Sequence, residues 1–232
     1  MSTNPPFGSA IVTGGSQGLG RALVTALAGR GWQVTTDARG AAPLDTLVGE
    51  LGTMVTAVPG DIANATHRAD LVRTAEVAGA LRLVIANAGT LGPTPLPSLA
   101  DVDLESVAST LAVNTTAQLG LVQLALPALR AHRGVLVLVT SDAAVEGYEG
   151  WGVYGASKAA LEHLGRVLAA EEPDVRVLVV DPGDMRTAMH QAAFPGEDIS
   201  DRPLPESSVP GFVALIDGDQ PSGRYRAMEV AP

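Results

Sequence analysis

Two runs of β-branched residues constrain the fold of this chain more than any other feature. Residues 135–139 read VLVLV and residues 175–180 read VRVLVV, and a helical pattern from about Val153 to Glu171 lies between them, ended by Pro173. A strand with both faces buried is almost wholly apolar, and such strands are typical of parallel sheets whose two faces are covered by helices. The two runs therefore predict a parallel sheet whose strands are joined by helical crossovers.

The same alternation extends over most of the chain. We expect strands near residues 10–12, 32–36, 55–58, 83–86, 135–139, 175–180 and 225–230, and helices near 21–28, beyond 44, and near 67–77, 101–132 and 153–171. This order predicts an α/β fold, a single doubly wound parallel β-sheet of about seven strands with helices on both faces. A chain of 232 residues, 46% of them hydrophobic, fits one domain over residues 1–232. Residues 187–210 are predicted as a flap over a cleft, with a linker as the alternative.

Charge and composition exclude several classes of function. The chain carries 25 acidic and 15 basic residues, a net charge of -10, which argues against a nucleic-acid partner. It has no cysteine, and no histidine pair has the spacing of metal ligands, so we expect neither thiol chemistry nor a required metal. No apolar run reaches the ~20 residues that span a bilayer, and Met1 to Gly8 do not resemble a signal peptide. We therefore expect a soluble, cytoplasmic protein without a membrane partner.

A glycine-rich turn follows the first expected strand. Residues 13–20 read TGGSQGLG and lead into a helix, so backbone N–H groups and the positive end of the helix can approach a pyrophosphate. The spacing TGxxxGxG differs from the common dinucleotide fingerprint GxGxxG. A tight strand-to-helix connection that binds nothing is the alternative.

A tyrosine and a lysine stand four residues apart, at Tyr154 and Lys158. This spacing puts both on one face of a helix, where the ammonium can stabilise the phenolate and make a usable base of a phenol with an ordinary pKa near ~10. A surface tyrosine beside a solvated lysine is the alternative. Lys158 is the only lysine among the 15 basic residues, and arginine could not supply the same compact charge, which favours a functional pair.

With these motifs, and with Asn-Ala-Gly at residues 87–89 after the fourth expected strand, the chain resembles the classical short-chain dehydrogenase/reductase family over most of its length. The resemblance implies a Rossmann fold and an NAD(P)-dependent oxidoreductase, a ketoreductase that interconverts a carbonyl and an alcohol by hydride transfer. It implies that Tyr154 is the general acid and base and that Lys158 lowers the pKa of Tyr154 and binds the ribose. Ser141 would orient the carbonyl, and Asn114 would belong to a proton relay. A strand-end serine and a capping asparagine are the alternatives for these two.

The resemblance also assigns contacts to the cofactor and to a small-molecule carbonyl or alcohol substrate. The cofactor residues are then Gly14, Ser16, Gln17, Gly18, Leu19, Gly20, Arg39, Asp61, Ile62, Asn87, Ala88, Gly89, Tyr154, Lys158, Pro182, Gly183 and Thr187. The substrate residues are then Ser141, Val145, Trp151, Tyr154, Met185 and Met189. Arg39 matches the arginine of many NADP enzymes, whereas NAD enzymes carry an acid at the position of Ala38, next to Asp37. NADP is therefore expected, with NAD as the alternative.

Other functions share parts of this pattern. A catalytically silent dinucleotide-binding regulator would keep the fold, but such proteins commonly lose part of the serine, tyrosine and lysine set that is complete here. A nucleotide-sugar epimerase or dehydratase shares YxxxK but generally needs a substantial C-terminal substrate domain. Residues 221–230 depart from the family pattern at the last strand, which puts the usual tetramer in doubt. We expect a homodimer through the long fourth and sixth helical regions.

Overall fold

One parallel sheet organises the molecule. The computed structural model describes residues 7–230, so residues 1–6, on which the expectation of no signal peptide partly rests, lie outside it. Within this range seven parallel strands follow the order β3-β2-β1-β4-β5-β6-β7. They are β1 (Ser9–Val12), β2 (Gln33–Ala38), β3 (Val55–Pro59), β4 (Leu81–Ala86), β5 (Val135–Val139), β6 (Arg176–Asp181) and β7 (Gly223–Arg226). The strand order reverses between β1 and β4, the kind of switch point at which α/β proteins bind ligands. The predicted doubly wound sheet is confirmed.

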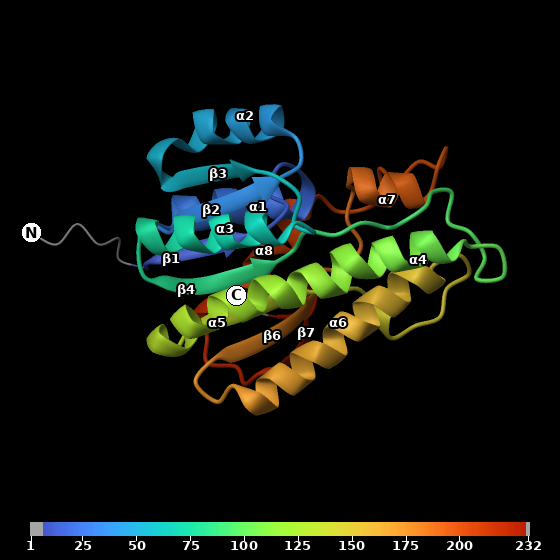
Figure 1. Ribbon diagram of the computed structural model, residues 1–232. Helices are drawn as coiled ribbons and strands as arrows, with labels where there is room; N and C mark the ends of the chain where they lie inside the picture. Colours follow the sequence, from blue (N-terminus) through green and yellow to red (C-terminus); the bar gives the residue numbers. More distant parts are fainter. Residues whose placement is uncertain (1–6, 231–232) are drawn as a thin grey trace, which may run out of the picture.

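Helices cover both faces of this sheet (Figure 1). One face carries α1 (Gly18–Gly29), α2 (Ala41–Leu51) and α8 (Val209–Asp217), and the other carries α3 (Ala65–Ala78), α5 (Ala117–His132) and α6 (Gly152–Glu171). Successive strand residues point to opposite faces. Val12 and Ile85 accordingly pack in the first core, whereas Ile11 and Val84 pack in the second. Both cores require apolar residues, which is why the strands read as continuous apolar runs.

The long helix expected near residues 101–132 is interrupted. Asp103 caps the start of α4 (Leu104–Leu111) by accepting a hydrogen bond from the Ser106 backbone N–H at 2.7 Å. A π-helical turn, η2 (Ala112–Thr116), then separates α4 from α5. Asn114 lies in this turn, and its side chain bonds to two other segments of the chain. Such turns are frequent at functional sites, and this one puts Asn114 between β4 and α6.

The last strand is displaced from its expected position. The sequence pattern favours residues 225–230, but β7 covers Gly223–Arg226 and a 3₁₀ turn, η5 (Ala227–Glu229), follows it. Ala227 is buried against α8, where a Cβ on Gly211 would lie 1.9 Å from the Ala227 carbonyl oxygen. This close packing takes the chain out of the sheet earlier than periodicity indicates.

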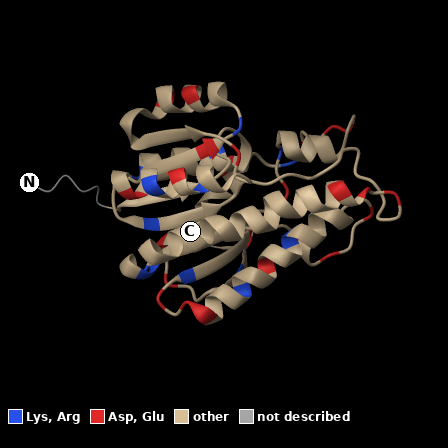
Figure 2. Ribbon diagram, viewed as in Figure 1, with Lys and Arg blue, Asp and Glu red and all other residues tan. Residues whose placement is uncertain are grey.

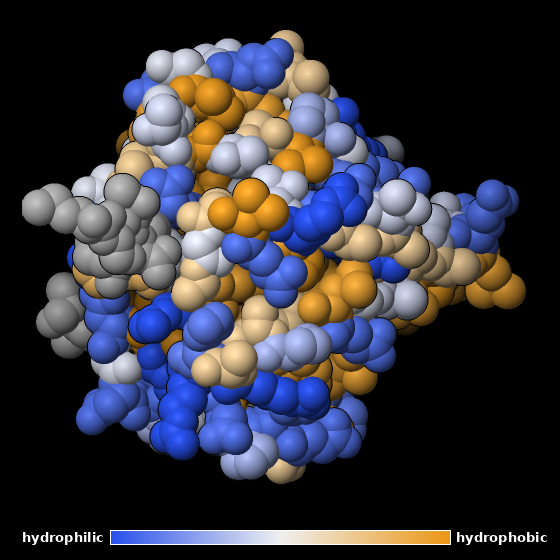
Figure 3. Space-filling model, turned by 60° about the vertical axis from the view of Figure 1, so that its left-hand side comes forward, coloured by the Kyte–Doolittle hydropathy of each residue, from blue (hydrophilic) through white to orange (hydrophobic). Residues whose placement is uncertain are grey.

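The carboxyl ends of the strands meet at the edge of the sheet that lies on the right in Figure 1. Residues 187–210 carry α7 (Ala188–Ala193) and η4 (Pro205–Ser207) at this edge. Acidic residues recur on the loops around α7 and at the start of α4 (Figure 2). The surface brought forward in Figure 3 belongs to the opposite end, where hydrophobic residues are scattered among hydrophilic ones. Within residues 7–230, no helix combines the length and apolar character that crossing a membrane requires.

Candidate active site

Two neighbouring cavities open at the carboxyl edge of the sheet. The large cavity, about 740 Å³, is bordered by the glycine turn, the ends of β2 and β4, and α7. The small cavity, about 430 Å³, is bordered by the 3₁₀ turn η3 (Asp142–Ala144), the start of α6, and α7. Tyr154 lines both cavities, as do Thr140 and Pro182. The phenol ring therefore stands at the boundary between them.

The glycine turn borders the large cavity at positions where side chains would not fit. Gly14 and Gly18 have φ angles of 72° and 54°, in the left-handed region that favours glycine. A Cβ on Gly15 would lie 2.0 Å from Thr36 Oγ1, and a Cβ on Gly20 would lie 2.1 Å from the Gly14 carbonyl oxygen. The start of α1, whose first N–H groups have no intrahelical partner, lines the cavity, and this arrangement suits a phosphate group.

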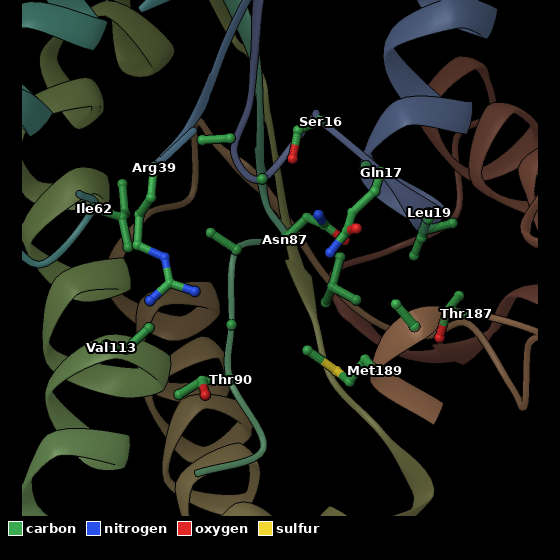
Figure 4. Close-up of a pocket in the computed structure, with 18 of the residues that line it drawn as sticks. Ser16, Gln17, Leu19, Arg39, Ile62, Asn87, Thr90, Val113, Thr187 and Met189 are labelled. Carbon is green, nitrogen blue, oxygen red and sulfur yellow. The ribbon is translucent and has the colours of Figure 1, made fainter. Parts of the chain in front are cut away.

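The residues predicted to bind the cofactor come together around the large cavity. All of them line it except Gly183, which lines the small cavity. In Figure 4, Gln17 and Leu19 face Arg39 and Ile62 across the cavity, with Asn87 between them. The Asn87 amide donates a hydrogen bond to the Thr13 carbonyl oxygen at 2.8 Å and so ties the end of β4 to the end of β1. A bounded space of this size, with a glycine cradle at one side, fits a dinucleotide.

Two charged residues at the end of β2 have different surroundings. Asp37 is 2% exposed, accepts a hydrogen bond from the Gly14 backbone N–H at 2.8 Å, and contacts His67 Nε2 at 3.0 Å. Arg39 is exposed, extends into the large cavity (Figure 4), and has no ion pair within residues 7–230. The Asp37 carboxylate is thus hydrogen-bonded within the fold, whereas the Arg39 guanidinium is available to a ligand in the large cavity.

Three of the four predicted catalytic residues lie on adjoining segments. Ser141 follows β5, and Tyr154 and Lys158 lie in the first turns of α6 with exposed fractions of 8% and 3%. Lys158 Nζ donates a hydrogen bond to the Val139 carbonyl oxygen at 2.9 Å. The Ser141 hydroxyl donates to Asp142 Oδ1 at 2.9 Å. The structure brings these three residues together, and in it the Ser141 hydroxyl and the Lys158 ammonium are hydrogen-bonded to Asp142 and Val139.

Burial dominates the protonation of this set. It raises the pKa of Tyr154 well above its ordinary value; the nearby Ser141 hydroxyl opposes this rise, and the charges of Asp142 and Asp181 add to it. Burial lowers the pKa of Lys158 to about 8. Lys158 is not among the groups that lower the pKa of Tyr154 here, since its ammonium is itself desolvated and its Nζ lies 5.7 Å from the centroid of the phenol ring. Its role in lowering that pKa stays a prediction.

Asn114 lines neither cavity. It is fully buried in η2, where its amide donates to the Thr90 carbonyl oxygen at 2.8 Å and to Ser157 Oγ at 2.9 Å. Its carbonyl oxygen accepts from the Thr90 backbone N–H at 2.8 Å. The side chain therefore connects the loop after β4 to α6 and is not a helix cap.

Most residues predicted to contact the substrate line the small cavity. Ser141, Trp151, Tyr154, Met185 and Met189 do so. Val145 does not; it follows η3 with half of its surface exposed, and its contact with the substrate stays a prediction.

Sequence reasoning missed the polar part of the small cavity. Asp142, Asp184 and His190 line it, together with the aromatic residues Trp151 and Phe194. Ring contacts run from Tyr154 to Trp151 at 5.6 Å, from Trp151 to Phe194 at 6.0 Å, and from Phe194 to His190 at 4.9 Å between centroids. The buried Nε2 of His190 has no hydrogen-bond partner within residues 7–230. These positions belong to no local motif, so only the tertiary contacts could reveal them.

Comparisons with known proteins identify the family of this chain. The family model described as short chain dehydrogenase matches residues 9–198. An uncharacterized oxidoreductase of Saccharomyces cerevisiae is 35% identical over 182 residues, 77% of this chain and 71% of the relative. Sepiapterin reductase of Mus musculus is 36% identical over 203 residues, 79% of this chain and 76% of the relative.

A solved structure gives the same result. A short chain dehydrogenase from Shigella flexneri complexed with NADP superposes with a TM-score of 0.86 and 29% identity, over 95% of this chain and 96% of that one. The chain therefore belongs to the short-chain dehydrogenase/reductase family and is an oxidoreductase of that family.

Proposed function

We propose that this protein reduces a ketone or an aldehyde to an alcohol with NADPH and catalyses the reverse oxidation. The observation that carries the proposal is the position of Tyr154 at the boundary of the two cavities, with Ser141 on the small-cavity side and Lys158 on the large-cavity side. A reductase of this kind needs a proton donor between its cofactor and its substrate. The nicotinamide cofactor, when bound, supplies the hydride.

The residues of the chain would supply the proton and the orientation. The raised pKa of Tyr154 keeps the phenol protonated near neutral pH, which is the state that can donate a proton to a carbonyl oxygen. Ser141 would turn its hydroxyl from Asp142 to that oxygen and so orient the carbonyl. Lys158, released from the Val139 carbonyl, would bind the ribose hydroxyls and bring its charge to the phenolate that is left. Asn114 would belong to the proton relay, and the hydrogen bonds of its side chain to Thr90 and Ser157 would hold its own backbone in place.

The choice of NADP over NAD rests on the end of β2. The Asp37 carboxylate is already bonded to Gly14 and His67, so it is poorly placed to accept ribose hydroxyl groups. Arg39 offers a free guanidinium that suits a 2′-phosphate. The NADP complex of the Shigella flexneri relative supports the same choice.

The small cavity favours neutral or cationic aromatic carbonyl compounds. Trp151 and Phe194 offer flat apolar surfaces, and the carboxylates of Asp142 and Asp184 lie at the rim. Within residues 7–230, neither lysine nor arginine lines this cavity. A carboxylate on the substrate would meet like charges, whereas a hydrogen-bond donor could pair with His190 Nε2.

The test combines turnover and binding. Loss of NADPH absorbance would be followed with a panel of ketones, aldehydes and quinones, and NADPH binding would be measured separately. Tyr154→Phe should keep the Kd for NADPH within about threefold and lower kcat by several orders of magnitude, because the variant has no proton to donate. Wild-type kcat in this variant would exclude Tyr154 from the role. Tight NADPH binding by the wild type without turnover of any compound would support the alternative of a catalytically silent regulator.

The assembly, the domain count and the flap belong to the same proposal. We propose a homodimer through α5 and α6, on which Leu124 and Val167 are 42% and 39% exposed. We also propose one domain over residues 1–232, with residues 187–210 as a flap that closes over the small cavity through Met189 and Phe194. A sedimentation measurement of mass would distinguish the dimer from a monomer or a tetramer. The cytoplasmic location stays a prediction.

A further inference from the structure

A cluster of polar side chains, three of them buried and one partly exposed, lies beside the catalytic residues and was not expected from any motif. It consists of Thr140, Glu162, Asp181 and Arg224, and we call it the Arg224 cluster. The side chains of Glu162 and Asp181 are only 2% and 5% exposed. Buried carboxylates need a charged or hydrogen-bonding partner. Arg224 in β7 meets this need, since its Nε lies 2.9 Å from Glu162 Oε1 and its terminal nitrogen lies 3.1 Å from Asp181 Oδ2.

The Arg224 cluster connects three segments that border the active site. The same terminal nitrogen of Arg224 donates to the Ser141 carbonyl oxygen at 3.3 Å. Thr140 donates to Glu162 Oε1 at 2.8 Å, and the other carboxylate oxygen of Asp181 accepts from the Gly183 backbone N–H at 3.0 Å. One guanidinium thus joins the ends of β5 and β6 to the middle of α6.

Glu162 continues the catalytic face of α6. Tyr154, Lys158 and Glu162 follow one another at intervals of four residues, so they lie on one side of the helix. The hydrogen bonds of Glu162 therefore fix the rotation and the position of the helix that carries Tyr154. Arg166 also contacts Glu162, at 3.3 Å, but its side chain is 62% exposed and it reaches no other member of the cluster.

Charge adds a second effect. The charged groups near Tyr154 are Lys158 on its own helix, Asp142 in η3 and Asp181 at the end of β6. The two carboxylates raise the pKa of Tyr154, and only Asp181 is paired with Arg224. Without the guanidinium, Asp181 would lose its only ion pair among the described residues, whereas Glu162 would keep its contact with Arg166.

We propose that Arg224 is a positioning residue of the active site. It fixes the Ser141 backbone relative to Tyr154 and neutralises the Asp181 carboxylate, whose charge acts on the tyrosine. The proposal rests on the proposed carbonyl reduction. It also gives a function to the C-terminal strand, which lies in the stretch, residues 221–230, that departs from the family pattern.

The test uses Arg224→Gln, with Arg226→Gln as the matched control. Arg226 lies in the same strand but pairs with Glu229 at the surface. In Arg224→Gln, kcat should fall roughly 10- to 100-fold while the Kd for NADPH changes less than about threefold. The pH midpoint of alcohol oxidation, which requires the phenolate, should rise by roughly one pH unit. Arg224→Lys should keep the pH midpoint near the wild-type value and restore kcat only in part, because lysine supplies the charge but not the fork of donors. Arg226→Gln should behave as the wild type.

A double variant keeps the test valid if Arg224→Gln folds poorly. Arg224→Gln with Glu162→Gln removes one buried charge of each sign and should restore the thermal stability without restoring kcat. A kcat and a pH midpoint equal to those of the wild type in this folded double variant would overturn the proposal. A parallel loss of NADPH binding and of turnover would also overturn it, because that result would indicate that Arg224 is merely structural. Failure of the wild type to reduce any carbonyl would instead contradict the proposed function.

Discussion

Replacement of Arg39 by glutamine should change the cofactor preference of the enzyme. Arg39 extends into the large cavity, and Asp37, the nearest carboxylate in sequence, is buried and bonded to Gly14 and His67. Hydrogen bonds to a charged group contribute about 1.5–3 kcal/mol. Since about 1.4 kcal/mol corresponds to a factor of ten, the Kd for NADPH should rise roughly 10- to 150-fold. The Kd for NADH, which has no 2′-phosphate, should change less than about threefold.

Fluorescence titration of NADPH and NADH against both proteins would measure this difference. Arg21→Gln is the matched control, because Arg21 lies in α1, pairs with Glu50 at the surface, and does not line the cavity. An equal loss of affinity for both cofactors in Arg39→Gln would refute the reasoning. So would a wild-type protein that binds NADH more tightly than NADPH.

Two further predictions concern Lys158 and the small cavity. Burial lowers the pKa of Lys158 from 10.5 to about 8. Below pH 8 the charged lysine therefore destabilises the cofactor-free protein by about 3 kcal/mol. Because the unfolded chain keeps its proton up to pH 10.5, the free energy of unfolding should rise between pH 8 and 10.5. Lys158→Met should therefore melt at a higher temperature than the wild type at pH 7, with a difference that shrinks above pH 8; a constant difference across this range would contradict the assigned pKa. The second prediction compares three acetophenones that carry a para hydroxymethyl, aminomethyl or carboxylate group. The kcat/KM of the carboxylate compound should be roughly tenfold lower than that of the hydroxymethyl compound, because its charge meets the Asp142 and Asp184 carboxylates. Asp184→Asn should reduce that discrimination, and equal rates for the three ketones would exclude the electrostatic explanation.

Much of the fold could be predicted because its signals are local. The apolar runs of β5 and β6 arise from burial on both faces, and burial of this kind is visible in consecutive residues. The errors occurred where distant contacts decide. The π-helical turn around Asn114 depends on hydrogen bonds to Thr90 and Ser157, and the early end of β7 depends on the contact between Ala227 and Gly211.

The candidate site divides in the same way. The residues assigned to the cofactor gather at the large cavity because the glycine turn, the Asn-Ala-Gly motif and the end of β2 each follow a strand of one parallel sheet, so their positions follow from the topology. The small cavity was predicted less well, since its walls come from η3, α6 and α7, and no sheet register relates those segments. For this reason Val145 was expected in the lining although it lies outside it, and Asp142, Asp184 and His190 were missed.

The sequence by itself determined the parallel sheet, the glycine turn and the four-residue spacing of Tyr154 and Lys158. Periodicity, steric limits on φ, and helix geometry act between neighbours, so these features can be read along the chain. The tertiary structure decided which charges are available for chemistry. It pairs Asp37 with His67, leaves Arg39 without an ion pair among the described residues, raises the pKa of Tyr154, and brings Arg224 to Ser141 from 83 residues away. Burial and charge pairing depend on contacts between distant segments, and those contacts exist only in the folded chain.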